Sequence, residues 1–318
     1  MKIAVLDDYQ NVVIGLNAFQ CLQGHEVTVF NDCVSDEAVL IERLKPFEAL
    51  VLIRERTQIT ETLLAHLPNL KLISQTGKVS NHIDVALCER YGVTVLEGIG
   101  SPVAPAELCW GLILAASRHL PSYVQQLQLG EWQKNGGLGL GRTLSGRTLG
   151  IWGLGKIGQR IAQFGQVFGM QILVWGSEAS RQKALELGYQ PAADKAEFFA
   201  KADVLSLHLR LNDATRGIVT KQDLLSMKTD SLFVNTSRAE LVESGALYQV
   251  MHANPTRQAA VDVYEDEPAL PSNEPLLSLP NVLCAPHLGY VEKNSYEIYF
   301  QAAFENVIGY AQQIELLK

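Results

Sequence analysis

The sequence lacks the cysteine patterns that build metal sites and disulfide frameworks. It has five cysteines, an odd number, and no two of them form a Cys-x-x-Cys pair. Isolated cysteines are typical of free thiols in a reducing compartment rather than of zinc ligands or structural disulfides. We therefore expect no metal ion and no disulfide bond among Cys21, Cys33, Cys88, Cys109 and Cys284.

Long apolar runs and an excess of basic charge are also missing. The most apolar stretch, residues 108–117, is about half the length that a membrane-spanning helix needs. The apolar run at the N-terminus is too short for a signal peptide. Lysine and arginine number 26 against 34 acidic residues, which gives a net charge of −8 and argues against a general affinity for nucleic acid or anionic membrane. We expect a soluble cytoplasmic protein without nucleic-acid or membrane partners.

The residues that are present predict an α/β protein of two domains. A chain of 318 residues with a 47% hydrophobic content can bury two cores. Short apolar runs alternate with amphipathic helical stretches, which favours parallel sheets flanked by helices. A long helix over 104–118 and an irregular arm over 121–146 separate two such series. We expect strands at 3–6, 27–30, 49–53, 72–74 and 93–96, then at 148–152, 171–175, 204–207, 232–235, 259–263 and 282–284, and a helix over 292–317.

A glycine-rich turn follows the first strand of the second series. Its sequence is Gly153-Leu154-Gly155-Lys156-Ile157-Gly158, and a helical pattern begins at Lys156. Between a strand and a helix, this spacing is typical of a dinucleotide-binding turn, because the glycines let a pyrophosphate approach free backbone N–H groups at the helix start. The turn predicts a nicotinamide dinucleotide held by Gly153, Gly155, Lys156, Ile157 and Gly158.

The next strand does not end in the acidic residue that usually accepts hydrogen bonds from the adenosine ribose. Gly176 stands at this place, followed by Ser177, and Arg181 lies one helical turn further on. Ser177 and Arg181 could bind the 2′-phosphate of NADP, whereas Glu178 could reach the ribose hydroxyls of NAD. The sequence leaves both cofactors open.

Three polar side chains follow later strands of the second series. Reduction of a 2-oxo acid needs a cation for the carboxylate and a proton donor for the alkoxide, and a histidine beside a carboxylate suits the second role. Arg238, Glu267 and His287 supply these groups, each just beyond a strand end, where ligands bind in open parallel sheets. On pattern alone, a surface arginine and a loop histidine remain alternatives.

Over nearly its whole length the chain resembles the D-isomer-specific 2-hydroxyacid dehydrogenases, the family of phosphoglycerate dehydrogenase and of glyoxylate and hydroxypyruvate reductases. Five motifs in a fixed order carry the resemblance: residues 148–158, 202–209, 234–238, 262–268 and 285–289. It implies that His287 is the acid/base, that Glu267 is its partner, and that Arg238 binds the substrate carboxylate and carbonyl. It further places Asp262 at the nicotinamide amide, and Leu209, Thr236 and Gly289 beside the cofactor.

The resemblance also implies two Rossmann- or flavodoxin-like domains with parallel sheets. Residues 1–100 and 286–318 would form a discontinuous substrate domain around a dinucleotide domain at 101–285. The helix that starts near Ala104 and the arm after it resemble the segment through which the family dimerises, so we expect a homodimer.

The substrate loop departs from the family pattern. Val79 replaces its usual second glycine, although the backbone N–H groups of Lys78 and Val79 could still bind a carboxylate. Arg56 resembles a phosphoglycerate-type arginine that faces the substrate, and a solvated arginine at a strand end is the alternative. We expect an oxidoreductase that acts on CH–OH donors and transfers a hydride between NAD(P)H and a small 2-oxo acid of the glyoxylate, hydroxypyruvate or phosphohydroxypyruvate class. A dinucleotide-sensing, corepressor-like protein on the same fold is the alternative.

Overall fold

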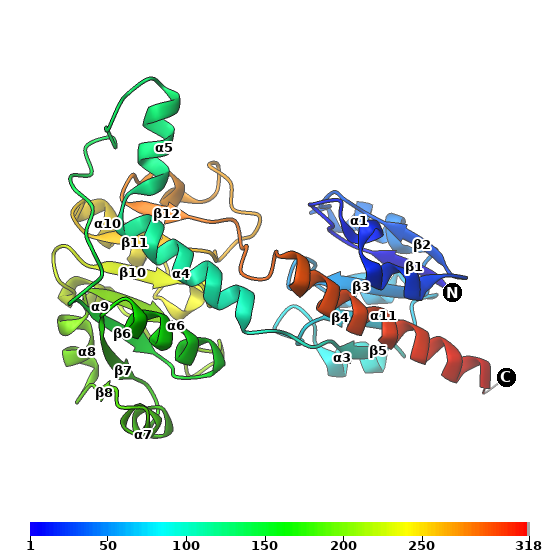
Figure 1. Cartoon of the computed structure of the whole chain (residues 1–318). Helices are drawn as coiled ribbons and strands as arrows, with labels where there is room; N and C mark the ends of the chain where they lie inside the picture. The colour runs from blue at the N-terminus through cyan, green and yellow to red at the C-terminus, as the bar shows by residue number, and fades with distance from the viewer. Residues whose placement is uncertain (317–318) are drawn as a thin grey trace. The chain divides into compact units, whose positions relative to one another are not determined.

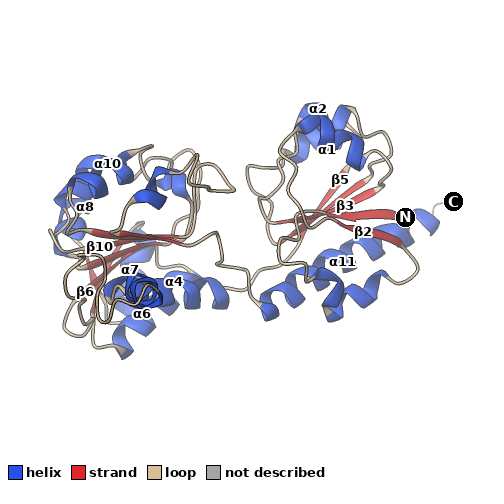
Figure 2. Ribbon diagram, turned by 90° about the horizontal axis from the view of Figure 1, so that it is seen from above, coloured by secondary structure: helices blue, strands red, loops and turns tan. Residues whose placement is uncertain are grey.

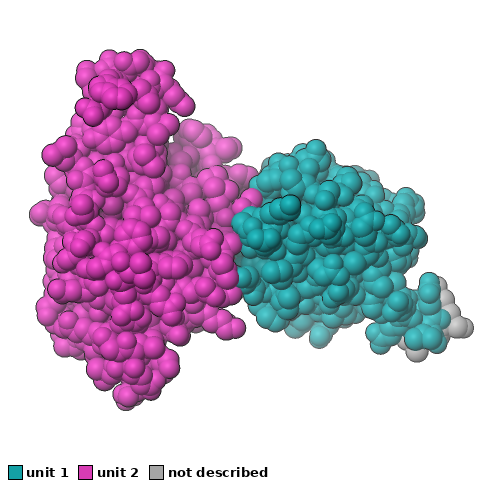
Figure 3. Space-filling model, viewed as in Figure 1, with its two compact units in different colours: residues 1–101, 292–318 teal, residues 102–291 magenta. Residues whose placement is uncertain are grey.

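The computed structural model describes residues 1–316 and contains two compact units. One comprises residues 1–101 and the C-terminal segment from Glu292, and the other comprises residues 102–291 (Figure 3). The second unit therefore includes residues 286–291, which we expected in the first domain. The reason is local, since Leu288 and Gly289 donate backbone hydrogen bonds to Asp262 of the same unit.

The first unit is built on a five-stranded parallel sheet with the strand order β2-β1-β3-β4-β5. Asp36, Thr60 and Asp84 begin the three helices that follow β2, β3 and β4, and each side chain accepts a hydrogen bond from a free backbone N–H group. Its elements are β1 (Lys2–Val5), η1 (Val13–Gly15), η2 (Asn17–Leu22), β2 (Glu26–Val29), α1 (Glu37–Leu44), β3 (Ala49–Ile53), α2 (Glu61–Ala65), β4 (Leu72–Thr76), α3 (Val85–Arg90), β5 (Thr94–Glu97) and α11 (Lys293–Leu316).

The two faces of this sheet are covered by different helices. Leu50 and Leu52 of β3 share one core with the apolar side chains of α1, α2 and α3. The C-terminal helix α11 packs on the opposite face against β3, β4 and β5 (Figure 2). Because side chains alternate between the faces of a strand, a fully buried strand such as β3 supplies both cores.

The second unit contains a seven-stranded parallel sheet with the strand order β12-β11-β10-β9-β6-β7-β8. The chain builds outward from β6 to β8 and then returns to build outward from β9 to β12, so the direction reverses between β6 and β9. Its elements are α4 (Val103–Ser117), α5 (Leu120–Gln128), β6 (Thr148–Trp152), α6 (Lys156–Val167), β7 (Gln171–Trp175), α7 (Glu178–Glu186), β8 (Gln190–Pro191), α8 (Lys195–Lys201), β9 (Val204–Leu207), α9 (Lys221–Ser226), β10 (Leu232–Asn235), η3 (Ala239–Leu241), α10 (Ala246–Ala253), β11 (Gln258–Val261), η4 (Pro275–Ser278) and β12 (Val282–Cys284).

Alternate residues of these strands enter two cores. Val204 and Val234 pack with α4 and α6, whereas Leu205 and Phe233 pack with α8, α9 and α10 on the other face (Figure 2). The predicted fold class, two α/β units with parallel sheets, is confirmed. Among residues 1–316, no helix has both the length and the apolar character that crossing a membrane requires.

The arm after α4 differs from the expectation of irregular structure. Residues Leu120–Gln128 form the helix α5, with Pro121 near its start, where a proline does not interrupt the hydrogen bonding of a helix. None of the side chains of α5 is buried, and the helix projects from the sheet of its own unit (Figure 1). Leu120, Val124 and Leu127 recur at helical spacing, which was the available signal for this helix.

Candidate functional site

The glycine-rich turn joins β6 to α6 and leaves open space beside Gly155. Gly153 has a φ of +98°, and a Cβ atom there would lie 2.5 Å from the carbonyl oxygen of His208. A Cβ atom at Gly158 would clash with the carbonyl oxygen of Gly153. At Gly155, by contrast, a Cβ atom would meet nothing within 4 Å. Two of the glycines are therefore required by the turn itself, and the third leaves space above it.

The start of α6 gives that space a chemical character. Gly155 is the residue before the helix and provides no side-chain cap, and Lys156 and Ile157 form its first positions. The first N–H groups of a helix have no partner within the helix, and together with its dipole they attract anions. The open space and the uncapped helix start fit the pyrophosphate of a dinucleotide. The turn also lies where the strand order reverses, the usual ligand position in open parallel sheets.

Two residues after β9 border the turn. The side chain of Leu209 would lie 3.1 Å from a Cβ atom at Gly153, and the N–H group of His208 donates to the carbonyl oxygen of Trp152. Burial lowers the pKa of His208 to about 4, so its ring is neutral at pH 7. Its Nε2 atom lies 3.0 Å from Ser206 Oγ. Sequence reasoning did not single out His208, although its place directly after a strand was the available signal.

The carboxyl ends of β10, β11 and β12 are in register. Asn235 pairs with Val261, and Val261 pairs with Cys284. Arg238 follows β10, Glu267 follows β11 and His287 follows β12, so all three predicted side chains leave the same edge of the sheet. This register explains how residues far apart in the sequence converge.

Glu267 and His287 form a hydrogen-bonded pair. Glu267 Oε2 lies 2.7 Å from His287 Nδ1, and the other carboxylate oxygen accepts the backbone N–H of Tyr264 at 3.1 Å. The imidazole is 19% exposed, and its edge lies against the ring of Tyr290. With Nδ1 bound to the carboxylate, Nε2 is the nitrogen left for proton exchange. This pair has the geometry of a histidine acid/base with an orienting carboxylate.

Buried groups hold the loop that carries His287. His287 itself has a φ of +51°, and both carboxylate oxygens of Asp262 accept backbone N–H groups of the following residues, at 2.7 Å from Leu288 and 2.8 Å from Gly289. Burial raises the pKa of Asp262 to about 6, which still leaves it mostly ionised at pH 7. The hydroxyl of Tyr264 donates to the carbonyl oxygen of Ala285 at 2.9 Å. Asp262, expected at the nicotinamide, thus also fixes the turn after His287.

Arg238 stands on a turn that is fixed at both ends. Asn235 Nδ2 donates to the carbonyl oxygen of Arg238, and Ser237 Oγ donates to that of Leu207. The guanidinium donates through Nη1 to the carbonyl oxygen of Ser237 at 2.6 Å. Thr236, between them, is half-buried. The loop therefore holds Arg238 beside the edge from which Glu267 and His287 emerge.

In the first unit, Arg56 is anchored by its surroundings. Its guanidinium lies 4.4 Å from the centre of the Tyr9 ring, Nη1 donates to the carbonyl oxygen of Asp7 at 2.6 Å, and Nη2 lies 3.3 Å from the hydroxyl of Tyr296. These contacts differ from those of a freely solvated arginine, which was the alternative.

The substrate loop shows a contact that the sequence did not reveal. The backbone N–H of Val79 donates to Glu97 Oε1 at 2.9 Å, and Lys78 Nζ lies 2.8 Å from Glu97 Oε2. The hydrogen bonds from Lys78 and Val79 hold the pKa of Glu97 below its usual range. A carboxylate of the chain itself thus occupies the Val79 N–H that we expected to bind a substrate carboxylate. The end of a neighbouring strand was the signal that could have pointed to Glu97.

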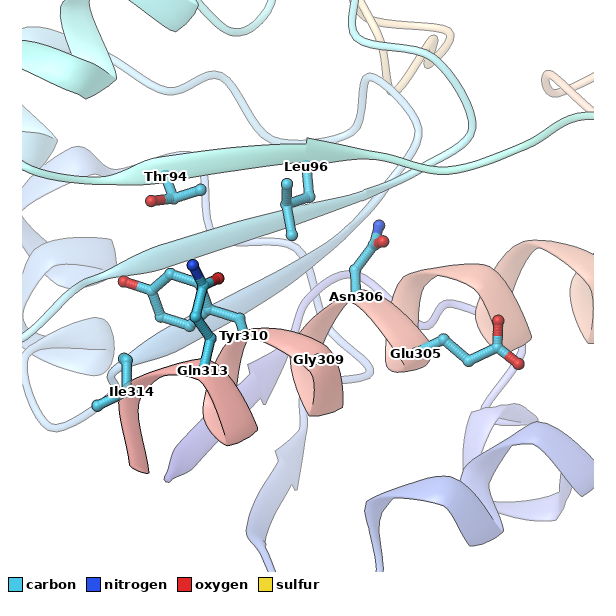
Figure 4. A pocket seen from close by; sticks show the side chains of 8 residues that line it. All are labelled: Thr94, Leu96, Glu305, Asn306, Gly309, Tyr310, Gln313 and Ile314. Atoms are coloured by element: carbon cyan, nitrogen blue, oxygen red, sulfur yellow. The ribbon is translucent and has the colours of Figure 1, made fainter. Parts of the chain in front are cut away.

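Other features of the described chain lie apart from these residues. A pocket of about 530 Å³ lies between β5 and α11 of the first unit, and none of the predicted site residues lines it (Figure 4). The side chains of Tyr310, Gln313 and Leu96 face it in that view. No cluster of three or more His, Cys, Asp or Glu side chains suited to a metal ion occurs within residues 1–316.

Comparison with known proteins gives consistent matches. A family model described as D-isomer specific 2-hydroxyacid dehydrogenase, NAD binding domain, matches residues 110–289, more than half of the chain. The crystal structure of a phosphoglycerate oxidoreductase from Vibrio cholerae O395 has 90% sequence identity and a TM-score of 0.98, over 98% of this chain and 99% of that one.

Curated relatives are more distant. A D-3-phosphoglycerate dehydrogenase of Methanocaldococcus jannaschii is 34% identical over 265 residues, which are 83% of this chain and 49% of that protein. A glyoxylate reductase of Aeropyrum pernix is 35% identical over 258 residues, 79% of this chain and 76% of that protein. The chain thus spans about half the length of the first relative and about three quarters of the second.

Proposed function

Because this chain belongs to the D-isomer specific 2-hydroxyacid dehydrogenase family, we propose that it transfers a hydride between a nicotinamide dinucleotide and a small 2-oxo or D-2-hydroxy acid. The observation that carries the proposal is the 2.7 Å pair of Glu267 and His287 at the sheet edge that also bears Arg238. The dinucleotide supplies or accepts the hydride when it is bound. The glycine turn from Gly153 to Gly158 holds its phosphates.

In the direction of reduction, His287 carries the proton that the substrate needs. As hydride reaches the carbonyl carbon, Nε2 of the protonated ring gives its proton to the carbonyl oxygen, which becomes the hydroxyl. Glu267 stabilises the imidazolium through Nδ1 and keeps Nε2 directed outward. Oxidation reverses each step, with neutral His287 as the base.

Arg238 binds the substrate carboxylate and polarises the carbonyl. Its planar guanidinium can donate two parallel hydrogen bonds, which a lysine cannot. Arg56 and the backbone N–H of Lys78 are the candidates in the first unit for the anionic groups of the substrate, because Glu97 accepts the N–H of Val79. The substrate class we propose is glyoxylate, hydroxypyruvate or phosphohydroxypyruvate, in line with the names of the relatives.

We also propose that the working form is a homodimer in the cytoplasm. The support for a dimer is the apolar surface of the arm, where Leu129, Trp132 and Leu140 are 70%, 74% and 92% exposed. Large exposed apolar groups gathered on one segment are typical of a protein–protein interface. The free cysteines of the described chain suit a reducing compartment.

A panel of 2-oxo acids tests the proposed reaction. Glyoxylate, hydroxypyruvate, phosphohydroxypyruvate and pyruvate would each be mixed with the protein and NADH or NADPH, and absorbance at the reduced nicotinamide would be followed. We expect turnover of at least one of the first three acids. Dinucleotide binding without turnover of any acid would contradict the proposal and favour a dinucleotide-sensing protein.

A further inference from the structure

The end of β7 cannot present a carboxylate to a bound adenosine ribose. Gly176 follows the strand with a φ of +148°, a conformation that residues with a side chain rarely adopt. A Cβ atom there would lie 3.3 Å from the Cβ of Ser180. The strained backbone conformation and the tight contact with Ser180 both disfavour an aspartate at the position where NAD-binding units usually carry one.

Ser177 and Arg181, which follow Gly176, have side chains that can bind an anion. Ser177 begins α7, and its hydroxyl oxygen accepts the N–H of Ser180. Arg181 lies four residues further on and donates its backbone N–H to the carbonyl oxygen of Ser177, so the two side chains share one face of the helix. This face borders the strand end, since the Arg181 guanidinium lies 5.1 Å from the centre of the Trp175 ring.

The charge of Arg181 is not balanced within its own surroundings. Arg181 has no acidic partner within 4 Å in the described part of the chain, and its Nε atom is buried without a hydrogen-bond partner. Elsewhere in α7, Lys183 and Glu186 form an ion pair at 3.0 Å. The guanidinium lies against the Trp175 ring without an ion-pair partner among the described residues, so its Nη groups can donate to an anionic ligand.

We propose that this site is selective for NADP(H), with Ser177 and Arg181 binding the phosphate on the 2′ position of the adenosine ribose. The inference rests on the proposed function, because it takes the glycine turn as the dinucleotide site. A carboxylate at the strand end would repel this phosphate. Gly176 has no side chain, so no such carboxylate is present. Two acidic residues remain nearby: Glu178, which is exposed in the first turn of α7, and Glu197, which forms an ion pair with Lys201.

Direct binding separates the two cofactors. Calorimetric titration of the full chain with NADPH and with NADH should give a dissociation constant at least roughly 10-fold lower for NADPH, the scale of charged hydrogen bonds. Arg181→Gln should weaken NADPH binding by roughly 10-fold and leave the affinity for NADH unchanged. Ser177→Asp keeps the helix cap but adds a negative charge. It should therefore weaken NADPH binding at least as much and leave NADH binding unchanged.

Two variants in the same helix serve as controls. Lys183→Gln removes an equal charge away from the strand end and should leave both affinities unchanged. Glu178→Gln should leave NADPH binding unchanged or tighter, whereas a loss of NADH binding in this variant would identify Glu178 as a ribose ligand and overturn the inference.

The results distinguish the inference from the function on which it rests. Equal or tighter binding of NADH by the unaltered chain would refute selectivity and leave the dehydrogenase proposal intact. An equal loss of both dinucleotides in Arg181→Gln would show a general effect on α7 and also refute it. Binding of neither dinucleotide would overturn both proposals together.

Discussion

The imidazole of His287, which follows β12, is held in position by residues that follow the neighbouring strand β11. Glu267 bonds Nδ1, Asp262 fixes the two residues after the histidine, and Tyr264 ties the loop before it. All three follow β11 within six residues. A short segment after one strand thus orients the acid/base that follows the next strand.

Loss of the imidazole should affect proton transfer and not dinucleotide binding. We expect His287→Ala to lower kcat by roughly 100-fold or more, the usual contribution of a positioned acid/base. The dissociation constant of the dinucleotide should stay the same, because the glycine turn is unaltered. Steady-state kinetics and calorimetry measure the two effects, and His66→Ala, at an exposed site in the first unit, is the control. A fully active variant would disprove the role of His287.

Removal of one hydroxyl tests the support of the loop. Tyr264→Phe keeps the buried ring and deletes the hydroxyl that donates to the Ala285 carbonyl and lies beside the Cys284 thiol. Because one hydrogen bond contributes about 0.5–1.5 kcal/mol, we expect kcat to fall roughly 3- to 10-fold with an unchanged dinucleotide affinity. Tyr189→Phe deletes a hydroxyl that bonds Gln166 and should change none of these values.

At the scale of elements, the turn between β6 and α6 contains glycines with two different roles, one in folding and one in dinucleotide binding. Gly158 is required by the fold, because a side chain there would strike the carbonyl oxygen of Gly153. Gly155 is bordered by open space, so a methyl group fits there without a clash. The same turn thus contains one glycine that the chain needs in order to fold and one that a phosphate needs in order to approach.

The two alanine variants should therefore differ. We expect Gly158→Ala to lower the thermal midpoint of unfolding and to lose dinucleotide binding as a consequence. Gly155→Ala should keep the unfolding midpoint within a few degrees and still weaken binding by roughly 10-fold or more, since its methyl group takes the place of the phosphate. Scanning calorimetry and dinucleotide titration test both, with Gly111→Ala in α4 as a control that meets nothing within 4 Å. Full affinity in Gly155→Ala would argue against a pyrophosphate at this turn.

The start of β6 is held by the carboxylate of Asp203, which comes directly before β9. It accepts the backbone N–H of Thr148 at 2.7 Å and lies 2.8 Å from Lys228 Nζ. Although burial acts in the opposite direction, these contacts hold its pKa below the usual value of 3.8. A depressed pKa contributes stability that is present above the unfolded-state value and is lost as pH falls through the folded-state value.

The stability of the chain should follow this titration. We expect Asp203→Asn to lower the free energy of unfolding by about 1–3 kcal/mol at pH 7, the scale of hydrogen bonds to a charged group. The difference from the unaltered chain should shrink as the pH falls below 3.8, because the carboxylate is then protonated in the unfolded state. Urea unfolding at pH 7 and pH 3 measures it, with the exposed Asp213→Asn as the control. A difference that does not depend on pH would contradict the electrostatic explanation.

At the scale of the whole molecule, the arm from α5 onward exposes apolar side chains that a monomer would leave in water. Leu127 and Trp132 are 54% and 74% exposed. Burial of such groups in a partner subunit is favourable by about 25 cal/mol per Å² of apolar surface.

Charge placed on this arm should separate the subunits. We expect Trp132→Glu with Leu127→Glu to sediment as a monomer at micromolar concentration, whereas the unaltered chain sediments as a dimer. Leu185→Glu places the same charge on an exposed leucine of α7 and should leave the dimer unchanged. An unaltered chain that sediments as a monomer would disprove the proposed assembly.

The sequence by itself determined the fold class and the dinucleotide turn. Short, nearly continuous apolar runs are typical of strands that are buried on both faces of a parallel sheet. The spacing of Gly153, Gly155 and Gly158 follows from local backbone geometry. Both signals act over a few residues, so no knowledge of distant contacts was needed to read them. The family motifs were readable for the same reason.

Only the tertiary structure decided how distant segments meet. The register of β10, β11 and β12 places Glu267 against His287, and no local pattern records which strands are neighbours. Local patterns also do not record that Asp262 accepts the N–H of Leu288 or that Glu97 accepts the N–H of Val79. Nor do they record the contact of Arg56 with the carbonyl oxygen of Asp7. Each of these contacts joins residues that are 18 or more positions apart, so it exists only once the strands are ordered in the sheet.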